Sequence, residues 1–205
     1  PTAEENSLAA PMRDHLHAMQ EKRPDSEVLC GVNADFYIMR KSNRVQGIMY
    51  KDGECLKGTF DGGEPSIAFA IMKDGTARII TQDEYELQKD NIQEAVGGRM
   101  KLVSNGEKTE LTDKSVHPRT AVGISANRKK VYLLVVDGRR EDYSVGVTLD
   151  RLATILVALG ADEAINLDGG GSVQLITENA EGKLEPRTPI QRRVANSLLL
   201  VEKKP

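Results

Sequence analysis

Short apolar segments that alternate with glycine-containing turns run through most of this 205-residue chain. In "SIAFAIMKDGTARII" the pair Asp74-Gly75 separates two such segments, and this pair favours the tight turn of a β-hairpin. Asn105-Gly106 closes "RMKLVSNGE" in the same manner, and "QGIMYKDGECLKGTF" repeats the pattern. The pattern predicts a domain whose core consists mainly of strands joined by short turns.

Two segments in the first half of the chain are compatible with helices. Residues 7–20 carry apolar residues at helical spacing, with Ser7 as the expected N-cap. Residues 82–95 are mostly polar and compatible with a helix, which Gly97-Gly98 would stop. The first half of the chain therefore contributes two predicted helices.

A third helix is predicted over residues 148–160. Thr148 is the expected N-cap, four leucines from Leu149 to Leu159 face inward, and Gly160 closes the segment. The helix leads into "EAINLD", which has the character of a strand. No linker, internal repeat or low-complexity segment interrupts the sequence. We therefore predict a single α+β domain over residues 1–205, with a mixed, β-rich sheet core and about three helices.

Charge and hydropathy exclude several classes of protein. The formal net charge is −3, so the chain lacks the basic excess with which general nucleic-acid-binding proteins neutralise phosphates. No apolar stretch approaches the roughly 20 residues of a membrane-spanning helix, and the N-terminal segment lacks the order of a signal peptide. We expect a soluble protein, cytosolic or the mature form of an exported one, without nucleic-acid partners or membrane insertion. The oligomeric state stays open.

The two cysteines do not indicate a metal site. The spacing of Cys30 and Cys55 fits no metal-binding motif. Cys30 lies in an apolar, strand-like segment, where a buried free thiol is the expected state. The alternative, a Cys30–Cys55 disulfide, would indicate an oxidising compartment.

The segment "INLDGGGSVQLI" combines polar side chains with three consecutive glycines. A nucleotide-binding loop would need a helix directly after the glycines, but "VQLIT" is strand-like and no phosphate-loop pattern is present. Asn166 and Asp168 alternate with Leu167, so both face one side of the predicted strand. Together with Ser172 they favour a ligand site that backbone amides approach closely. A tight hairpin with incidental polar residues is the alternative.

Two further predicted strands carry charged residues at their ends. In "HPRTAVG", Arg119 and Thr120 begin a strand, where a guanidinium and a hydroxyl can bind phosphate or carboxylate oxygens. In "VYLLVVDGRR", Asp137 ends an apolar run and precedes Arg139, and neighbouring arginines should keep its carboxylate ionised. The structural alternatives are a surface arginine and an Asp-Gly turn with a salt bridge.

A fourth strand end carries Asn33 and Asp35 in "GVNADFY", for which an Asx-type turn is the alternative. Strand ends with Asn, Asp or Arg therefore occur four times in one small domain. This repetition favours a single pocket at which the strands converge, and its arginines and carboxylates suit an anionic ligand.

In combination these segments resemble the phosphodiester glycosidase family over about residues 28–201. The resemblance rests on "NADFY", "GGRMKLVSNG", "HPRTAVG", "VVDGRR" with "SVGVTL", "NLDGGGS" and the closing "RRVANSLLL". The order of "PRTAVG", "DGR" and "NLDGGGS" is a specific combination. The resemblance implies that the protein releases an N-acetylglucosamine-type sugar from a phosphodiester by cleaving the bond between sugar C1 and oxygen.

The chain departs from the family pattern in two places. Where the family often has two glycines after the first Asn, this chain has Ala34 and Asp35. The family domain usually carries strands upstream of this motif, so we expect either a domain that lacks those strands or a sheet completed differently. The glycan substrates of the family, which has many bacterial members, imply a periplasmic, cell-envelope or secreted protein.

The resemblance and the residues together predict how the substrate is held. Arg119, Arg139 and the amides of Gly169, Gly170 and Gly171 are expected to bind the phosphate. Because the second pKa of a phosphate monoester is about 6, the phosphate departs with little help from a general acid. The other predicted substrate-binding residues are Asn33, Asp35, Thr120, Asn166, Ser172 and Asn196.

Asp168, with Asp137 as second choice, is expected to activate water or to attack C1 directly. Arg119 counts among the predicted catalytic residues because it would neutralise phosphate charge. No cofactor is predicted. One alternative is a metal-dependent phosphodiesterase in which Asp35, Asp137 and Asp168 bind Mg²⁺ or Ca²⁺. Another is a non-catalytic module of the cell envelope that binds glycans or anions.

Overall fold

The computed structural model describes residues 9–38, 43–61, 66–189 and 192–204. Three α-helices lie within these residues, namely α1 (Met12–Lys22), α2 (Gln82–Gln88) and α3 (Leu149–Ala158). Two short 3₁₀ helices are η2 (Lys89–Asn91) and η3 (Gly170–Ser172). The strands are β1 (Ala10–Pro11), β2 (Ser26–Asn33), β3 (Met49–Lys51), β4 (Glu54–Lys57), β5 (Ile67–Met72), β6 (Ala77–Thr81), β7 (Ile92–Ser104), β8 (Glu107–Lys108), β9 (Arg119–Ile124), β10 (Val131–Val136), β11 (Glu163–Leu167), β12 (Leu175–Glu178), β13 (Leu184–Pro186), β14 (Arg193–Val194) and β15 (Ser197–Lys203).

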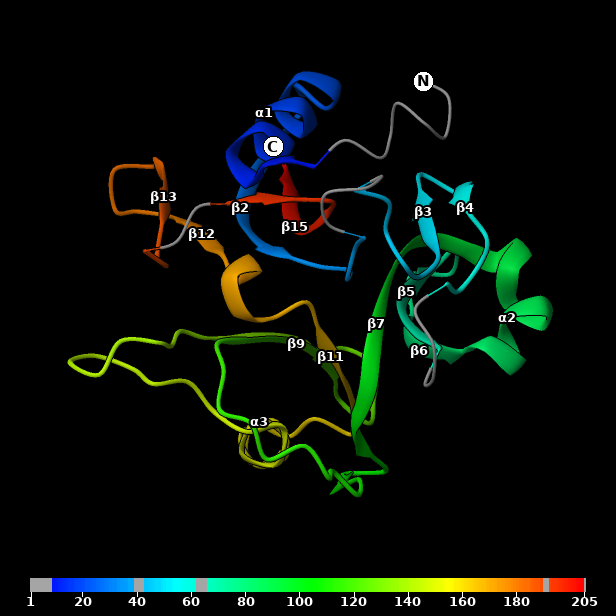
Figure 1. Cartoon of the computed structure of the whole chain (residues 1–205). Helices are drawn as coiled ribbons and strands as arrows, with labels where there is room; N and C mark the ends of the chain where they lie inside the picture. The colour runs from blue at the N-terminus through cyan, green and yellow to red at the C-terminus, as the bar shows by residue number, and fades with distance from the viewer. Residues whose placement is uncertain (1–8, 39–42, 62–65, 190–191, 205) are drawn as a thin grey trace.

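The strands form three sheets, and every pairing between these strands is antiparallel. The largest sheet has nine strands in the order β10-β9-β11-β7-β3-β4, with β5 and β8 also paired to β7 and β6 paired to β5. A four-stranded sheet has the order β13-β12-β2-β15, and β1 pairs with β14. Figure 1 shows α1 beside the four-stranded sheet and α3 against β9 and β11. The fold is α+β with a β-rich core, as predicted.

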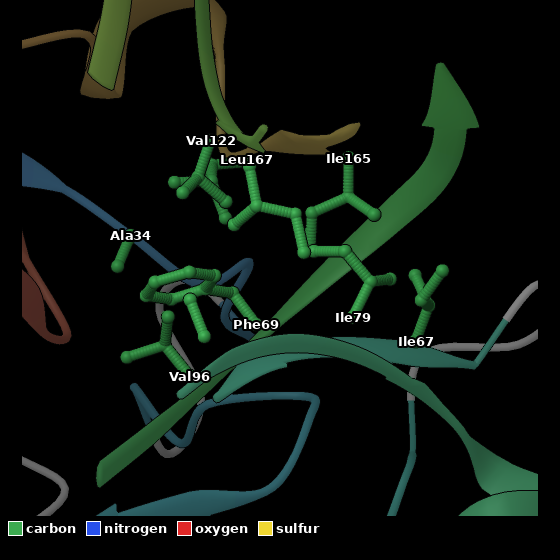
Figure 2. Packing of buried hydrophobic residues seen from close by; sticks show 10 residues of the cluster. Ala34, Ile67, Phe69, Ile79, Val96, Val122, Ile165 and Leu167 are labelled. Carbon is green, nitrogen blue, oxygen red and sulfur yellow. The ribbon is translucent and has the colours of Figure 1, made fainter. Parts of the chain in front are cut away.

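One apolar core lies against the inner strands of the nine-stranded sheet. Ile165 and Leu167 of β11 are buried, and they belong to one cluster with Phe69 of β5, Val96 of β7 and Val122 of β9 (Figure 2). Burying a side chain of this size contributes roughly 1.5–3 kcal/mol to folding. Because successive side chains of a strand point to opposite faces, this burial directs the intervening and following polar residues to the other face.

Helix α3 follows its prediction closely. The hydroxyl of Thr148 accepts a hydrogen bond from the backbone N–H of Arg151 at 3.2 Å, which confirms the N-cap. Three of the four predicted leucines are buried against the sheet. The fourth, Leu159, is 51% exposed, so its predicted inward orientation is wrong. It is the C-cap residue and lies beyond the last helical turn.

The predicted helix over residues 82–95 is wrong beyond Gln88. Strand β7 follows after the short helix η2 and runs through Gly97-Gly98. The glycines do not stop a helix. They let another segment approach the strand, because a Cβ on Gly97 would lie 2.5 Å from Oδ2 of Asp35.

The predicted hairpin turns are confirmed. Strands β5 and β6 pair across Asp74-Gly75, and β7 pairs with β8 across Asn105-Gly106. Both glycines have the positive φ that these turns require, +82° and +75°. The turn chemistry of the sequence therefore determines where these strands reverse.

Three other predictions concern the chain outside the sheets. Helix α1 begins at Met12, after Pro11, and the predicted N-cap Ser7 lies outside the described residues. Cys30 and Cys55 are both free. No helix in the described part of the chain has the length and apolar character needed to cross a membrane.

Candidate active site

The candidate site lies where the end of β2 meets the end of β11, two strands from different sheets. In Figure 1 the short helix η3, which follows β11, lies between the four-stranded and the nine-stranded sheets. The backbone N–H of Asp168 donates to the carbonyl oxygen of Ala34 at 2.8 Å. This bond joins the segments "NADFY" and "NLDGGGS", so two of the four predicted strand ends come together.

Asn33 ties these strand ends to each other. Its Nδ2 donates to the carbonyl oxygen of Asp168 at 2.6 Å. Its Oδ1 accepts from Oγ1 of Thr120 at 2.8 Å and from the backbone N–H of Gln174 at 3.0 Å. Asn33 and Thr120 are both buried, at 1% and 0% exposure. The polar atoms of these two residues bind other parts of the chain and so position the strand ends. Their predicted contact with substrate stays a prediction.

Asp35 is a deeply buried carboxyl group. The residue is 3% exposed, and its Oδ2 accepts from the backbone N–H of Gly47 at 2.8 Å. Its own N–H donates to Oδ1 of Asn196 at 2.8 Å, so Asn196 positions this residue. Burial raises the pKa of Asp35 to about 7, because the charged form loses its hydration. The negative charge of Asp168 also raises the pKa of Asp35, whereas the positive charge of Lys57 lowers it. The carboxyl groups of Asp35 and Asp168 therefore interact.

Asp168 carries the second carboxyl group, which is half-buried, with a side chain 15% exposed. Burial raises its pKa above the ordinary value, while the hydrogen bond from Ser172, the charge of Arg192 and the backbone N–H of Gly169 oppose that rise. Nη2 of Arg192 lies 4.0 Å from Oδ2 of Asp168 and donates to Oγ of Ser172. Ser172 therefore joins the carboxyl group to a guanidinium.

Two arginines flank Asp168, and each lies over an aromatic ring. Cζ of Arg99 is 4.9 Å from the ring centroid of Phe36, and Cζ of Arg192 is 5.7 Å from that of Tyr37. Both distances are within the range of a cation–π interaction. The charge of Arg99 also lowers the pKa of Asp168. The aromatic residues of "NADFY" thus hold two cations beside the carboxyl group.

Asn166 adds a buried amide to the same face. It lies directly opposite Arg99 in the register of β11 and β7, and opposite residues share a face of the sheet. Asn166 is 4% exposed, yet its Oδ1 has no hydrogen-bond partner among the described residues. The same is true of Nε of Arg99 and Nε of Arg192. Because buried polar atoms normally have partners, these three suit a polar ligand beside Asp168.

The glycines after Asp168 allow close contacts rather than supplying a row of amides. The N–H of Gly170 donates to the carbonyl oxygen of Pro118 at 2.8 Å, so this amide is engaged within the chain, and its predicted bond to phosphate stays a prediction. A Cβ on Gly170 would lie 3.0 Å from Nη2 of Arg139. A Cβ on Gly171 would lie 3.2 Å from Nη1 of Arg192. The absence of side chains lets both guanidinium groups approach the turn.

Arg119 does not extend toward the carboxyl groups. Its Nη2 donates to the carbonyl oxygen of Ser115 at 2.9 Å and lies 3.5 Å from Oδ2 of Asp113, and its Nε donates to the carbonyl oxygen of Val147 at 3.3 Å. Burial lowers the pKa of Arg119, and the charge of Asp113 opposes this change. The guanidinium holds loops in place before β9 and before α3. The guanidinium is thus engaged within the chain, and its predicted contact with phosphate stays a prediction.

Asp137 follows β10, which β9 separates from β11 in the sheet. Its Oδ1 accepts from the N–H of Gly138 at 2.8 Å, as in the simple Asp-Gly turn. Asp35, Asp137 and Asp168 do not gather into a cation site, because the described part of the chain contains no group of three His, Cys, Asp or Glu residues that could hold a metal. The bond from Asp168 to Ala34 and the interaction of the two carboxyl groups place Asp35 beside Asp168.

A groove of about 580 Å³ lies elsewhere on the molecule. Its walls are mainly apolar and include Leu133 of β10, Phe69 of β5 and Leu198 of β15. Among the predicted site residues it contacts Asn196 alone. Neither carboxyl group lines the groove, but the groove adjoins Asp35 through Asn196.

Arg99 and Arg192 are the site residues that the sequence patterns did not single out. Arg99 directly follows the glycine pair in "GGRMKLVSNG", and Arg192 begins "RRVANSLLL". Both segments contribute to the family resemblance, so that resemblance was the available signal. Their proximity to Asp168 depends on contacts between distant segments, which no local pattern contains.

The model of a protein family described as phosphodiester glycosidase matches residues 26–201 of the chain. The structure is similar to that of the catalytic domain of zebrafish N-acetylglucosamine-1-phosphodiester alpha-N-acetylglucosaminidase, auto-inhibited by its pro-peptide. The TM-score is 0.63 and the sequence identity 23%. The match covers 86% of this chain and 63% of the zebrafish chain. The structure of this chain is also similar to that of a hypothetical protein from Synechocystis, with a TM-score of 0.60 and 14% identity. That match covers 97% of this chain and 55% of the Synechocystis chain. The curated proteins contain no significant match. The chain thus spans less than two thirds of each of these two structures and shares their fold.

Proposed function

The chain belongs to the phosphodiester glycosidase family, and we propose that it hydrolyses the bond between C1 of a sugar and the oxygen of a phosphodiester. The proposed sugar is of the N-acetylglucosamine kind, carried by a small molecule or a glycan of the periplasm or cell envelope. One observation carries the proposal. The carboxyl groups of buried Asp35 and half-buried Asp168 interact and have raised pKa values, and Arg99 and Arg192 flank Asp168.

The two arginines supply the positive charge that a phosphodiester needs. Guanidinium groups stay charged at neutral pH and bind phosphate oxygens through two parallel hydrogen bonds. The ring of Tyr37 and the hydroxyl of Ser172 hold Arg192 while its Nε stays without a partner among the described residues. Because a departing phosphate is a weak base, with a second pKa of about 6, fixed positive charge is sufficient and a general acid is not required.

Asp168 is the group that we assign to attack C1 or to activate the attacking water. Ser172 and Gly169 donate to its carboxylate, and the nearby arginines favour its ionised form despite burial. As the C1–oxygen bond breaks, its electron pair leaves with the phosphate and positive charge develops on the sugar ring. A carboxylate beside C1 stabilises that charge, and a proton lost from water balances the charge of the product.

Asp35 controls the charge beside Asp168. With a pKa of about 7, its carboxyl group is largely protonated below neutral pH, so one negative charge and not two faces the anionic substrate. At higher pH both groups are ionised and repel the phosphate. We therefore expect kcat/KM to decrease above about pH 7 and to decrease again in acid as Asp168 becomes protonated. Oδ1 of Asn166 offers an acceptor for a sugar hydroxyl or the acetamido N–H.

A product analysis tests the proposal. The protein is incubated with the methyl phosphodiester of N-acetylglucosamine 1-phosphate in water enriched in oxygen-18, and the products are identified by mass spectrometry. Label on the released sugar, and loss of turnover in Asp168→Asn, are the expected results. Label on the phosphate would contradict C1–oxygen cleavage. Binding of the substrate without turnover would favour a non-catalytic module.

Two further variants sharpen this test. Asp142→Asn is a matched control, because Asp142 is an exposed carboxylate paired with Arg140 at 3.5 Å and should be dispensable for turnover. Asp137→Asn and Asp35→Asn are compared directly. Loss of turnover in Asp137→Asn with retention in Asp35→Asn would remove Asp35 from the mechanism. Circular dichroism confirms that each variant is folded.

A further inference from the structure

Lys57, the last residue of β4, carries an ammonium group that is nearly removed from solvent. Its side chain is 8% exposed, and its Nζ lies 3.3 Å from Oδ2 of Asp61. Nζ donates to the carbonyl oxygens of Gln46 at 3.2 Å and Gly47 at 3.0 Å, and also to that of Thr59. An ammonium has three N–H donors and no acceptor, so these contacts use its whole hydrogen-bonding capacity within the chain.

The peptide group between Gln46 and Gly47 joins Lys57 to the carboxyl group of Asp35. Its carbonyl oxygen accepts from Lys57, and its N–H, which is that of Gly47, donates to Oδ2 of Asp35 at 2.8 Å. Because a peptide group is planar, fixing its carbonyl oxygen also fixes the direction of its N–H. Lys57 therefore orients the donor that binds Asp35.

The side chain of Gln46 extends this connection to Arg99. Oε1 of Gln46 accepts from Nη2 of Arg99. The backbone N–H of Gln46 donates at 2.8 Å to the carbonyl oxygen of Phe36, the residue whose ring faces the same guanidinium. Gln46 thus holds the cation that lies beside Asp168.

Close backbone packing also restricts the segment that Lys57 binds. A Cβ on Gly47 would lie 2.4 Å from Cα of Gly97 in β7 and 3.1 Å from Oδ2 of Asp35. Only a residue without a side chain can approach so closely. The contact with β7 and the hydrogen bonds of Lys57 together define where this segment lies.

The ammonium and carboxyl groups also affect each other through their charges. Burial lowers the pKa of Lys57, which the charges of Asp61 and Asp35 oppose and that of Arg44 assists. Burial raises the pKa of Asp35, which the charge of Lys57 opposes and that of Asp168 assists. Each group therefore stabilises the charged form of the other.

We propose that Lys57 is a positioning residue of the candidate site, which holds Asp35 and Arg99 in place through the segment Gln46-Gly47. The inference rests on the proposed function and deepens it, because it adds a residue that controls the site without touching the substrate. Lys57 forms and breaks no bond in the reaction.

Nuclear magnetic resonance tests this connection without the need for turnover. In the wild type, the amide proton of Gly47 should shift as Asp35 ionises, with a midpoint at about pH 7. In Lys57→Met the amplitude of this shift should fall by at least about half, because the peptide group is no longer held toward Asp35. The carbon-13 resonance of the Asp35 carboxyl group should titrate about one pH unit higher, a change of about ten-fold in its acid dissociation constant.

The rate profile tests the consequence for the reaction. With the methyl phosphodiester of N-acetylglucosamine 1-phosphate, kcat/KM of Lys57→Met should be about ten-fold lower below pH 7, because Asp35 and Arg99 are less well held. The basic limb should move to higher pH together with the titration of Asp35.

Two variants control this experiment. Lys51→Met makes the same change in β3, the strand paired with β4, where Nζ of Lys51 lies 3.1 Å from Oε1 of Glu94. It should change neither the titration of the Gly47 amide nor the basic limb. Lys57→Gln keeps an uncharged N–H donor, so it serves if Lys57→Met does not fold, and its changes should have the same direction and a smaller size. Circular dichroism confirms that each variant is folded.

The outcomes separate this inference from the proposed function. An amide of Gly47 that titrates with unchanged amplitude in a folded Lys57 variant overturns the inference. Loss of that titration with unchanged kcat/KM and an unmoved basic limb also overturns it. Absence of turnover in the wild type overturns the proposed function, and the amide of Gly47 then decides the connection alone.

Discussion

Replacing Asp35 by asparagine should remove a specific pH dependence from the stability of this fold. Asp35 is 3% exposed, and burial raises its pKa from 3.8 to about 7. Between these two values the folded chain holds a proton on Asp35, whereas the unfolded chain does not. The contribution of this group to the unfolding free energy is therefore fully present below pH 3.8 and is lost as the pH rises to about 7.

The size of the effect follows from the change in pKa. A displacement from 3.8 to about 7 corresponds to about 4 kcal/mol of unfolding free energy. Asparagine has nearly the same shape, and its Oδ1 can still accept from the N–H of Gly47, but it does not ionise. The unfolding free energy of the wild type minus that of Asp35→Asn should therefore decrease by about 4 kcal/mol between about pH 4 and about pH 8.

Urea denaturation followed by circular dichroism at several pH values measures this difference. Asp74→Asn is an informative control, because two hydrogen bonds from Thr76 lower the pKa of Asp74. The contribution of Asp74 to stability is present at higher pH and is lost as the pH falls, so its wild-type-minus-variant difference should increase with pH. The unfolding free energy of the wild type minus that of Asp35→Asn could instead stay constant from about pH 4 to about pH 8. That result would show that burial does not retain the proton on Asp35, and it would refute the reasoning.

Three other substitutions have defined outcomes. Asn33→Ala should lower the unfolding free energy in urea by about 3 kcal/mol, because three polar groups lose their partner. These are the carbonyl oxygen of Asp168, the hydroxyl of Thr120 and the backbone N–H of Gln174. A loss below about 1 kcal/mol would contradict this. Gly97→Ala should cost about 3 kcal/mol, seen as a lower Tm, because its Cβ would lie 2.5 Å from Oδ2 of Asp35; an unchanged Tm would show that the strand can move aside. Arg192→Gln should raise the pKa of Asp168 further, so the acidic limb of the kcat/KM profile should move to higher pH. If the acidic limb does not move, the charge of Arg192 does not control the pKa of Asp168.

Two matched variants control for general disturbance. Gly75→Ala places a methyl group in a hairpin turn with no atom within 4 Å, so it should cost only about 1 kcal/mol through its positive φ. Arg140→Gln removes an exposed arginine whose partner is Asp142, and it should not move the acidic limb. These variants separate the effect of a specific contact from the general effect of a substitution.

Features that depend on neighbouring residues could be predicted from the sequence. Thr148 caps α3, and Gly75 and Gly106 adopt the positive φ of hairpin turns, because these effects act over a few residues. The alternation of Ile165 and Leu167 with polar residues likewise predicts which face of β11 is buried. The sequence therefore locates the strand ends at which the polar residues of the candidate site occur.

The sequence does not contain the distances that decide how these strand ends combine. Asn33 and Asp168 are 135 positions apart in the chain, and their hydrogen bond exists only because β2 and β11 meet. The same packing places Asp35 beside Asp168. It also turns Arg119 toward the loops that it holds and brings Arg99 and Arg192 to Asp168 in its place.

The nature of the polar groups and the local geometry of their strands were thus determined by the sequence alone. Their pairing, and with it the raised pKa of Asp35, was decided only by the tertiary structure. The physical reason is that turn preference and strand alternation act over a few residues, whereas burial and electrostatic interaction depend on which distant segments pack together.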